Sequence, residues 1–334
     1  MNLNISYLLT FILSLFLTFF LIKKFINISH KLKNYGEDNS FIIKTEKVPT
    51  SGGIVIFFVF ILTFIFFNYF NLEQFNENIP NRPYLLLISI CALFFTSVYD
   101  DFNLIHPIYK LILQVLFTYL SIACLNLNEI VLPLKIGILI FVIFWVYIIN
   151  IINFIDGSDG FLTSYSLFFF TSIFLSDLFL LDFYSIIKTI SFLILPILIG
   201  FLYFNKPEAK LFMGDSGSIF LGFLIGFASL ELILQGYWKL SFILLMYPLL
   251  DCTTTLIIKT KNGHYPWARL FDYFFLGPIK KNNNHKFVLK IISIYLVINF
   301  LIFIGQIKYE ESFIFILLSL ISTIITLFIY KKKS

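Results

Sequence analysis

Three short stretches of this sequence place carboxylates and amides at the ends of long apolar runs. They read YDDFNLIHPIYK at 99–110, NIINFIDGSDGF at 150–161 and FMGDSGS at 212–218. A carboxylate at the end of a membrane span is costly unless it is hydrated, paired or bound to a metal, so such residues are candidates for function. Because the carboxylates cluster with glycines, serines and asparagines, the three stretches predict a polar site.

The adjacent carboxylates of the first stretch require a positive partner. Asp100 and Asp101 cannot both ionise cheaply in a half-buried position without a counter-charge. Lys110, about two and a half helical turns further on, supplies only part of that charge. A divalent cation serves better, so the pair is a candidate for a position beside a metal.

The other two stretches add oxygen ligands and no sulfur. Asp156 and Asp159 share a face if helical, whereas the glycine after each favours a turn that brings backbone N–H groups close to an anion. Asn150 and Asn153 have the same spacing one turn earlier, and Asp215 lies among glycines and serines. Such hard ligands favour Mg²⁺ or Mn²⁺ held together with substrate phosphates. The residues alone therefore indicate a site for a metal-bound phosphate.

Each stretch also has a purely structural interpretation. An Asp-Asp pair at a helix end is often a cap or a solvated face, and asparagines in membrane helices often join helices by hydrogen bonds. Gly-Asp-Ser-Gly is also compatible with a tight connection between two spans. The convergence of all three stretches favours the functional interpretation.

The elements that must position these residues are membrane helices. The chain of 334 residues is 59% hydrophobic and 13% charged, which excludes an ordinary soluble domain and indicates an all-α, polytopic integral membrane protein. Apolar runs of about 16 to 20 residues can cross the hydrocarbon, and they predict about 10–11 transmembrane helices in a single domain over 1–334. The runs are 5–22, 53–70, 84–98, 108–125, 136–152, 161–176, 186–203, 219–234, 240–257, 288–305 and 313–330.

The distribution of lysine and arginine predicts an N-out, C-in orientation. Basic residues near span ends are retained on the cytoplasmic side. With the N-terminus outside, 17 of the 24 basic residues fall in cytoplasmic segments and four in the opposite ones. All three polar stretches then face the cytoplasm. The predicted cytoplasmic loops are 23–52, 99–107, 153–160, 204–218 and 258–287.

The polar motifs resemble those of one enzyme family. DDFNLIHPIYK resembles the Asp-Asp motif, with a lysine ten residues after the first aspartate, of the polyprenyl-phosphate N-acetylhexosamine-1-phosphate transferase superfamily, or glycosyltransferase family 4. NIINFIDGSDGF is similar to its Asn-x-x-Asn-x-x-Asp-Gly-x-x-Gly signature, and FNKPEAKLFMGDSGSIFLG to its Phe-Asn-x-Pro and Phe-Met-Gly-Asp-x-Gly-Ser elements. KVPTSGG at 47–53 and PLLDCTTT at 248–255 are similar to two further elements, so the resemblance covers Lys47 to about Thr255.

The resemblance implies a reaction and a set of roles. The reaction transfers a sugar 1-phosphate from a UDP-N-acetylhexosamine to undecaprenyl phosphate, releases UMP and requires Mg²⁺, with Mn²⁺ as a possible substitute. Asp100 would accept or exclude the last proton of the lipid phosphate, and Asp101 would help to position that phosphate or the metal. Asp215 and the side-chain oxygen of Asn153 would bind the metal, and Lys110 would neutralise the transferring phosphate.

Further positions are expected to bind the nucleotide sugar. Phe212 would stack on uracil. The remaining candidates for substrate binding are Asn150, Asp156, Asp159, Asn205, Lys47, Arg269 and His285.

One departure from the family lies in the last large cytoplasmic loop. The family carries a histidine motif there, whereas HYPWARLFDYFFLGPIKKNNNHKF places Leu270, Tyr273 and Phe274 near where those histidines belong. Arg269 or Lys280 is a candidate substitute ligand for pyrophosphate, and His285 is alternatively a solvated loop histidine. Because the triple-histidine motif of the phospho-N-acetylmuramoyl-pentapeptide branch is absent, the sequence argues against that branch and leaves the hexosamine open.

Two other functions stay open beside the transferase: a catalytically weak relative that binds prenyl phosphate, and a secondary transporter. A transporter would place charges near the bilayer midplane and show interrupted repeats, and the sequence has neither. The expected product is a lipid-diphosphate sugar that initiates a cell-envelope glycan, such as lipopolysaccharide or cell wall, made by a multi-pass protein of the inner (plasma) membrane. The expected partners are UDP-N-acetylhexosamine, undecaprenyl phosphate and the lipid bilayer, without nucleic acid, and a homodimer stays open.

Overall fold

A computed structural model describes residues 5–32, 48–70, 83–103, 105–125, 134–179, 185–265 and 272–333. All regular structure within these ranges is helical, and each of the eleven predicted spans coincides with a helix. The all-α, polytopic membrane fold predicted from the apolar runs is therefore confirmed. Eight helices of the described ranges are long and apolar enough to cross a membrane, and three apolar helices are shorter, over Gly53–Phe67, Pro107–Ile122 and Phe161–Ser176.

The described residues form twelve α-helices and one 3-10 turn. In chain order they are α1 (Ile5–Leu32), α2 (Gly53–Phe70), α4 (Pro83–Phe102), α5 (Pro107–Ile122), α6 (Leu134–Phe154), α7 (Phe161–Phe179), α8 (Ser185–Asn205), α9 (Gly214–Leu234), α10 (Trp238–Lys261), the 3-10 turn η2 (Phe274–Leu276), α11 (Gly277–Asn282), α12 (His285–Lys308) and α13 (Ile314–Lys333).

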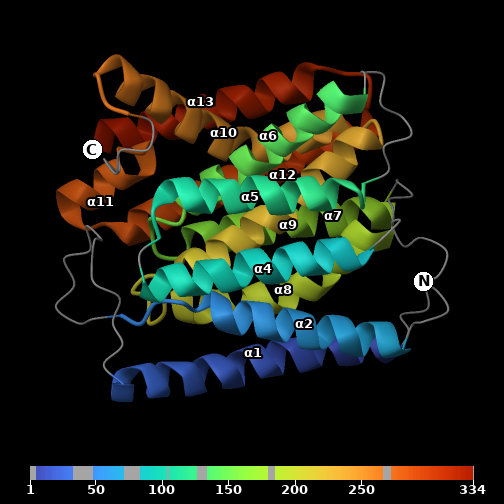
Figure 1. The fold of residues 1–334 in the computed structure, drawn as a ribbon. Coiled ribbons are helices and arrows are strands. Elements are labelled where there is room, and N and C mark those ends of the chain that lie inside the picture. Colours follow the sequence, from blue (N-terminus) through green and yellow to red (C-terminus); the bar gives the residue numbers. More distant parts are fainter. Residues whose placement is uncertain are drawn as a thin grey trace.

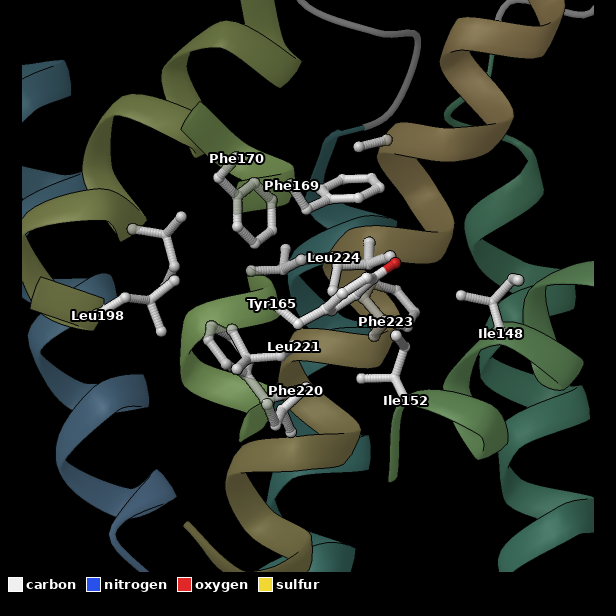
Figure 2. Close-up of a cluster of buried hydrophobic side chains, with 14 of the residues drawn as sticks. Ile148, Ile152, Tyr165, Phe169, Phe170, Leu198, Phe220, Leu221, Phe223 and Leu224 are labelled. Carbon is white, nitrogen blue, oxygen red and sulfur yellow. The ribbon is translucent and has the colours of Figure 1, made fainter. Parts of the chain in front are cut away.

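Helix α9 forms the centre of the bundle. Figure 1 shows the long helices side by side along a common direction, with α1 and α13 at opposite margins. Almost every residue of α9 is buried, and the helix packs against α6, α4, α2 and α10. Figure 2 shows its side chains Phe220 and Leu221 in the same buried cluster as Tyr165 of α7 and Ile152 of α6. Because α9 begins at Gly214, the central helix presents the FMGDSGS stretch at one end of the bundle.

Small residues let α9 and α6 approach closely, as is common between membrane helices. A Cβ atom added at Gly222 would lie 2.9 Å from the Cα of Ile149, and one added at Gly226 would lie 2.3 Å from Cδ1 of Trp145. The indole Nε1 of Trp145 donates a hydrogen bond of 3.0 Å to the carbonyl of Phe223. The relative position of α6 and α9 is therefore set by backbone-level contacts, which matters because both helices end in candidate site residues.

The PTSGG segment is joined to the segment that precedes α9. The backbone N–H of Phe212 donates to the carbonyl of Pro49 at 2.9 Å, and the carbonyl of Phe212 accepts from Gly52 at 2.9 Å. The beginnings of α2 and α9 are so close that a Cβ atom at Gly53 would lie 2.0 Å from the backbone nitrogen of Gly217. This contact explains why glycines occupy both positions.

Candidate active site

Five polar side chains from four helices meet at the end of the bundle where α4 connects to α5 (Figure 1). They come from the last turn of α4, the first turn of α5, the last turn of α6 and the first turn of α9. The residues are Asp100, Asp101, Lys110, Asn153 and Asp215. Residues up to 115 positions apart in the sequence are thus brought into one cluster.

Lys110 is shared between two carboxylates. Its Nζ atom lies 2.9 Å from Oδ2 of Asp215 and also contacts Oδ2 of Asp100. The other oxygen of Asp100 accepts a hydrogen bond of 2.7 Å from the backbone N–H of Ile105. One lysine therefore partly compensates the negative charge of two carboxylates. An additional positive charge would compensate the remainder.

Asp101 caps the start of the central helix. Its Oδ1 accepts from the backbone N–H of Asp215 at 2.8 Å, and its Oδ2 accepts from that of Ser216 at 3.3 Å. A carboxylate at this position satisfies two otherwise unpaired N–H groups and complements the helix dipole. Gly214 has a φ of +75°, and a Cβ atom there would lie 2.8 Å from Asp101 Oδ2. Asp101 thus fixes the direction of Asp215, and its predicted role toward phosphate or metal stays a prediction.

Asn153 is oriented by two acceptors on α9. Its Nδ2 donates to Asp215 Oδ1 at 3.0 Å and to Ser218 Oγ at 2.8 Å. Since the amide nitrogen faces α9, the amide oxygen is the atom of Asn153 that remains to bind a cation. Ser218, the second serine of GDSGS, was not singled out from the sequence, although its position one turn after Asp215 was a signal for it.

The fit of a magnesium ion depends on the chemistry of these donors. The described residues contain no group of three or more His, Cys, Asp and Glu side chains that could hold a metal ion. Mg²⁺ requires fewer protein ligands than that, because it commonly binds one or two carboxylates and keeps waters and substrate phosphates. Asp215, Asp100 and the Asn153 amide supply hard oxygens without sulfur, so the residues present suit this ion.

Asn150, a partly buried residue of α6, makes a hydrogen bond that fixes the orientation of the Gln114 amide. Its Nδ2 donates to the carbonyl of Val146 at 2.7 Å and to Oε1 of Gln114 at 2.7 Å. A carbonyl only accepts, so the amide nitrogen of Asn150 must face it, and Gln114 must present its oxygen to Asn150. Gln114 lines a small pocket together with Asp100 and Lys110. Gln114 was not predicted from the sequence; its signal was the position one helical turn after Lys110.

The DGSDG segment is a turn between α6 and α7, as its glycines indicated. Gly160 has a φ of +72°. Asp159 is buried, and its Oδ2 accepts from the backbone N–H of Ala209 at 2.9 Å. His285, also buried at the start of α12, places Nδ1 3.3 Å from the backbone nitrogen of Asp159. The alternative of a solvated loop histidine is therefore wrong for His285, which joins the turn to α12.

Asp156 is an acidic residue of this turn whose surroundings disfavour its charged form. Burial, followed by the nearby carboxylates of Asp215, Asp101 and Asp159, raises the pKa of Asp156 well above its usual value. A group in this setting gains from any cation, or any hydrogen-bond donor of a substrate, that reaches the site.

Asn205 and Phe212 frame the other side of the turn. Asn205 is buried; its Oδ1 accepts from Thr163 Oγ1 at 2.8 Å and from Gly160 N at 3.2 Å, while its Nδ2 donates to Leu211 O at 2.9 Å. These bonds give Asn205 a clear part in holding two loops together. Phe212 is only partly buried. The predicted nucleotide contacts of both residues stay predictions.

Two predicted substrate-binding residues, Lys47 and Arg269, lie outside the described residues, as does Leu270. Tyr273 and Phe274, which occupy the region of the family's histidines, are described. The Tyr273 ring stacks on that of Phe154 with a centroid separation of 5.7 Å, directly after Asn153 in α6. This part of the loop is therefore next to the site.

Comparison with known proteins bears on this arrangement. The family model of glycosyl transferase family 4 matches residues 84–233, which includes the five clustered side chains and the DGSDG turn. This segment, a little under half of the chain, is similar to glycosyl transferase family 4. The resemblance predicted from the motifs is confirmed, and the family segment begins at α4 and ends within the last turn of α9.

Family 4 relatives of two kinds match this chain. An undecaprenyl-phosphate alpha-N-acetylglucosaminyl 1-phosphate transferase of Thermotoga maritima is 26% identical over 85% of this chain and 84% of its own length. A phospho-N-acetylmuramoyl-pentapeptide-transferase of Prochlorococcus marinus is 29% identical over 72% of this chain and 68% of its own length. Another, of Staphylococcus carnosus, is 27% identical over 59% of this chain and 56% of its own length. The match thus spans little more than half of the staphylococcal protein. Both kinds match at similar identity, including the branch that the missing histidine motif argued against.

Proposed function

We propose that this protein transfers N-acetylhexosamine 1-phosphate from a UDP-sugar to a polyprenyl phosphate such as undecaprenyl phosphate. A phosphate oxygen of the lipid attacks the phosphorus that carries the sugar, the bond from that phosphorus to the UMP oxygen breaks, and UMP leaves. The product is a lipid diphosphate sugar. The observation that carries the proposal is the cluster in which Lys110 bridges Asp100 and Asp215 within the segment that is similar to family 4.

The residues have distinct parts in this proposal. Asp100 lies beside Lys110, lines the same pocket, and takes up or excludes the last proton of the lipid phosphate. Lys110 places a positive charge next to the transferring phosphate. Asp101 acts indirectly, because its hydrogen bonds to the backbone of Asp215 and Ser216 hold the first turn of α9 in place.

Mg²⁺ is the proposed cofactor, with Mn²⁺ as a substitute. Asp215 and the amide oxygen of Asn153 would hold it, with Asp100 next to them. When bound, the ion would draw negative charge from the diphosphate of the donor, and stabilisation of developing charge normally contributes most of the rate enhancement in such chemistry. The support for this assignment is the all-oxygen donor set and the incomplete compensation of two carboxylates by one lysine.

We place the nucleotide part of the UDP-sugar beside the DGSDG turn. Asp156 at the DGSDG turn and Phe212 before α9 are the partly exposed groups that would meet the ribose, uracil or sugar. Asn205 and His285 hold the backbone of that turn by buried hydrogen bonds, and Asp159 joins the turn to the backbone of Ala209. The hexosamine is left open, since relatives named for two different sugar substrates match equally well.

Purified protein, undecaprenyl phosphate, Mg²⁺ and a panel of UDP-N-acetylhexosamines test the proposal. We expect UMP release with at least one donor and a lipid product heavier by one N-acetylhexosamine phosphate. EDTA should abolish UMP release, and added Mg²⁺ or Mn²⁺ should restore it. Binding of the lipid phosphate without UMP release from any donor would favour the catalytically weak relative instead, and full turnover in excess chelator would exclude the metal.

A further inference from the structure

Another buried carboxylate, on α10, lies outside the cluster described above. Asp251 of α10 belongs to the PLLDCTTT stretch and is fully buried. Its Oδ2 accepts a hydrogen bond of 2.8 Å from the hydroxyl of Tyr247, and its Oδ1 accepts one of 3.1 Å from the backbone N–H of Phe274. A buried carboxylate is retained only where such partners compensate its loss of water. The bond to Phe274 connects α10 to a segment 23 residues further along the chain.

That segment, Tyr273 to Leu276, lies against the turn that carries Asp156 and Asp159. A Cβ atom added at Gly157 would lie 3.1 Å from Cδ2 of Leu276 and 3.2 Å from Cε2 of Phe275. The Phe275 ring also stacks on Phe161, which begins α7, with centroids 4.7 Å apart. With the Tyr273–Phe154 pair, the segment therefore contacts the turn on both sides and in its middle.

Helix α10, which carries Asp251, is fixed by hydrogen bonds to two neighbouring helices. Pro248 lacks a backbone N–H, which leaves the carbonyl four residues earlier without its helical partner. That carbonyl, of Leu244, accepts a hydrogen bond of 3.0 Å from the hydroxyl of Tyr165 on α7. The carbonyl of Ile243 next to it accepts from Asn299 Nδ2 of α12 at 2.8 Å. Helix α10 is thus fixed by two neighbouring helices just before it presents Asp251.

We infer that Asp251 is a positioning residue for the nucleotide-sugar side of the active site. By fixing the backbone of Phe274, it holds the Tyr273–Leu276 segment against the Gly157 turn and so sets the place of Asp156. It touches neither substrate nor reacting atoms. The inference rests on the proposed function for its kinetic consequence, while the contact between α10 and the loop stands on the hydrogen bond itself.

The inference predicts a selective effect on the donor. Asp251→Ala removes both accepting oxygens, and we expect the Kd and KM for the UDP-sugar to rise about tenfold, with kcat and the KM for lipid phosphate within about twofold of wild type. Asp251→Asn keeps an oxygen that can accept from Phe274, so its donor Kd should stay within about threefold. Tyr165→Phe is the matched control, because it removes a buried hydrogen bond to the same helix but leaves the contact with Phe274 intact.

Three readouts on monodisperse protein decide the matter: the equilibrium Kd for UDP-sugar, the two KM values, and amide exchange over 273–276 and 156–160. Faster exchange and a raised donor Kd in Asp251→Ala alone support the inference. Equal donor Kd in Asp251→Ala and Tyr165→Phe overturns it, whatever their stability. A wild-type protein that binds the UDP-sugar but releases no UMP would end the proposed transferase function, and the Kd comparison would still decide the role of Asp251.

Discussion

At the scale of single residues, the decisive feature of the site is one lysine between two carboxylates. Lys110 contacts Asp100 on α4 and Asp215 on α9, whose positions in the sequence are 115 residues apart. Removing the lysine leaves two close negative charges without a shared partner, an arrangement that is costly at a half-buried site. Its charge should matter for turnover more than for insertion of the protein.

Lys110→Met should lower UMP release at saturating substrates by about a hundredfold, because it removes a charge that stabilises the transferring phosphate. The control is Lys239→Met in the first turn of α10, where the lysine donates a hydrogen bond to the main-chain carbonyl of Glu310. We expect that variant to keep nearly wild-type turnover. Turnover above about a third of wild type in Lys110→Met would show that the lysine is only structural.

Asp156→Asn should stabilise the protein in the absence of substrate. The pKa of Asp156 is raised in the folded state by burial and by three neighbouring carboxylates, so the folded state binds more protons than the unfolded state above pH of about 4. The stability of the wild type therefore falls as pH rises through the folded pKa, and the variant lacks this loss. The difference in Tm between variant and wild type should be larger at pH 8 than at pH 5. Glu208→Gln, at a largely exposed carboxylate, should show no such trend.

The residues of the cluster could be listed from the sequence, but their partners could not. Spacing identified Asp100, Lys110 and Asp215 as members of one polar site, because all three lie at ends of apolar runs. It did not indicate that Asp101 would face the backbone of α9, since that depends on how two distant helices cross. Gln114 was not predicted for a similar reason: the sequence does not show that Asn150 of another helix is its hydrogen-bond partner.

At the scale of elements, the central position of α9 follows from its small residues. Gly222 and Gly226 face α6 at distances that leave no room for a side chain. Apolar runs predicted the helices and their approximate ends, since their length alone meets the requirement of the bilayer. They did not predict which helix would be central, because a run that is apolar all round does not mark the faces that meet protein.

Gly226→Ala should therefore lower the Tm by several degrees, because its Cβ would overlap Trp145 of α6, an indole that is fully buried. Adding Trp145→Phe should recover part of the loss by making room for the methyl group. Ser229→Ala on the same helix adds no volume and is the control. A Tm for Gly226→Ala equal to that of the control would mean that α9 and α6 are not packed as described.

At the scale of the whole molecule, the charge distribution predicts the side of the membrane on which the site lies. Cysteine introduced at Asn283, in a background without the native cysteines, should be protected from an impermeant thiol reagent in intact cells. Cysteine at Asn76 should be labelled, because the excess of lysine and arginine assigns the two positions to opposite sides. The reverse pattern of labelling would place the site outside the cytoplasm.

The most direct test of the central claim is turnover of Asp215→Asn. The substitution keeps the size of the side chain and the acceptor for Asn153, but it removes the charge that Lys110 and the proposed cation share. If that charge stabilises the leaving UMP and the phosphorus, the loss should appear in kcat, by about a hundredfold or more, and not in insertion or folding. We expect a monodisperse protein with almost no UMP release at saturating donor. A variant that keeps more than about a third of wild-type turnover would contradict the account, because Asp215 would then serve only the turn at the start of α9.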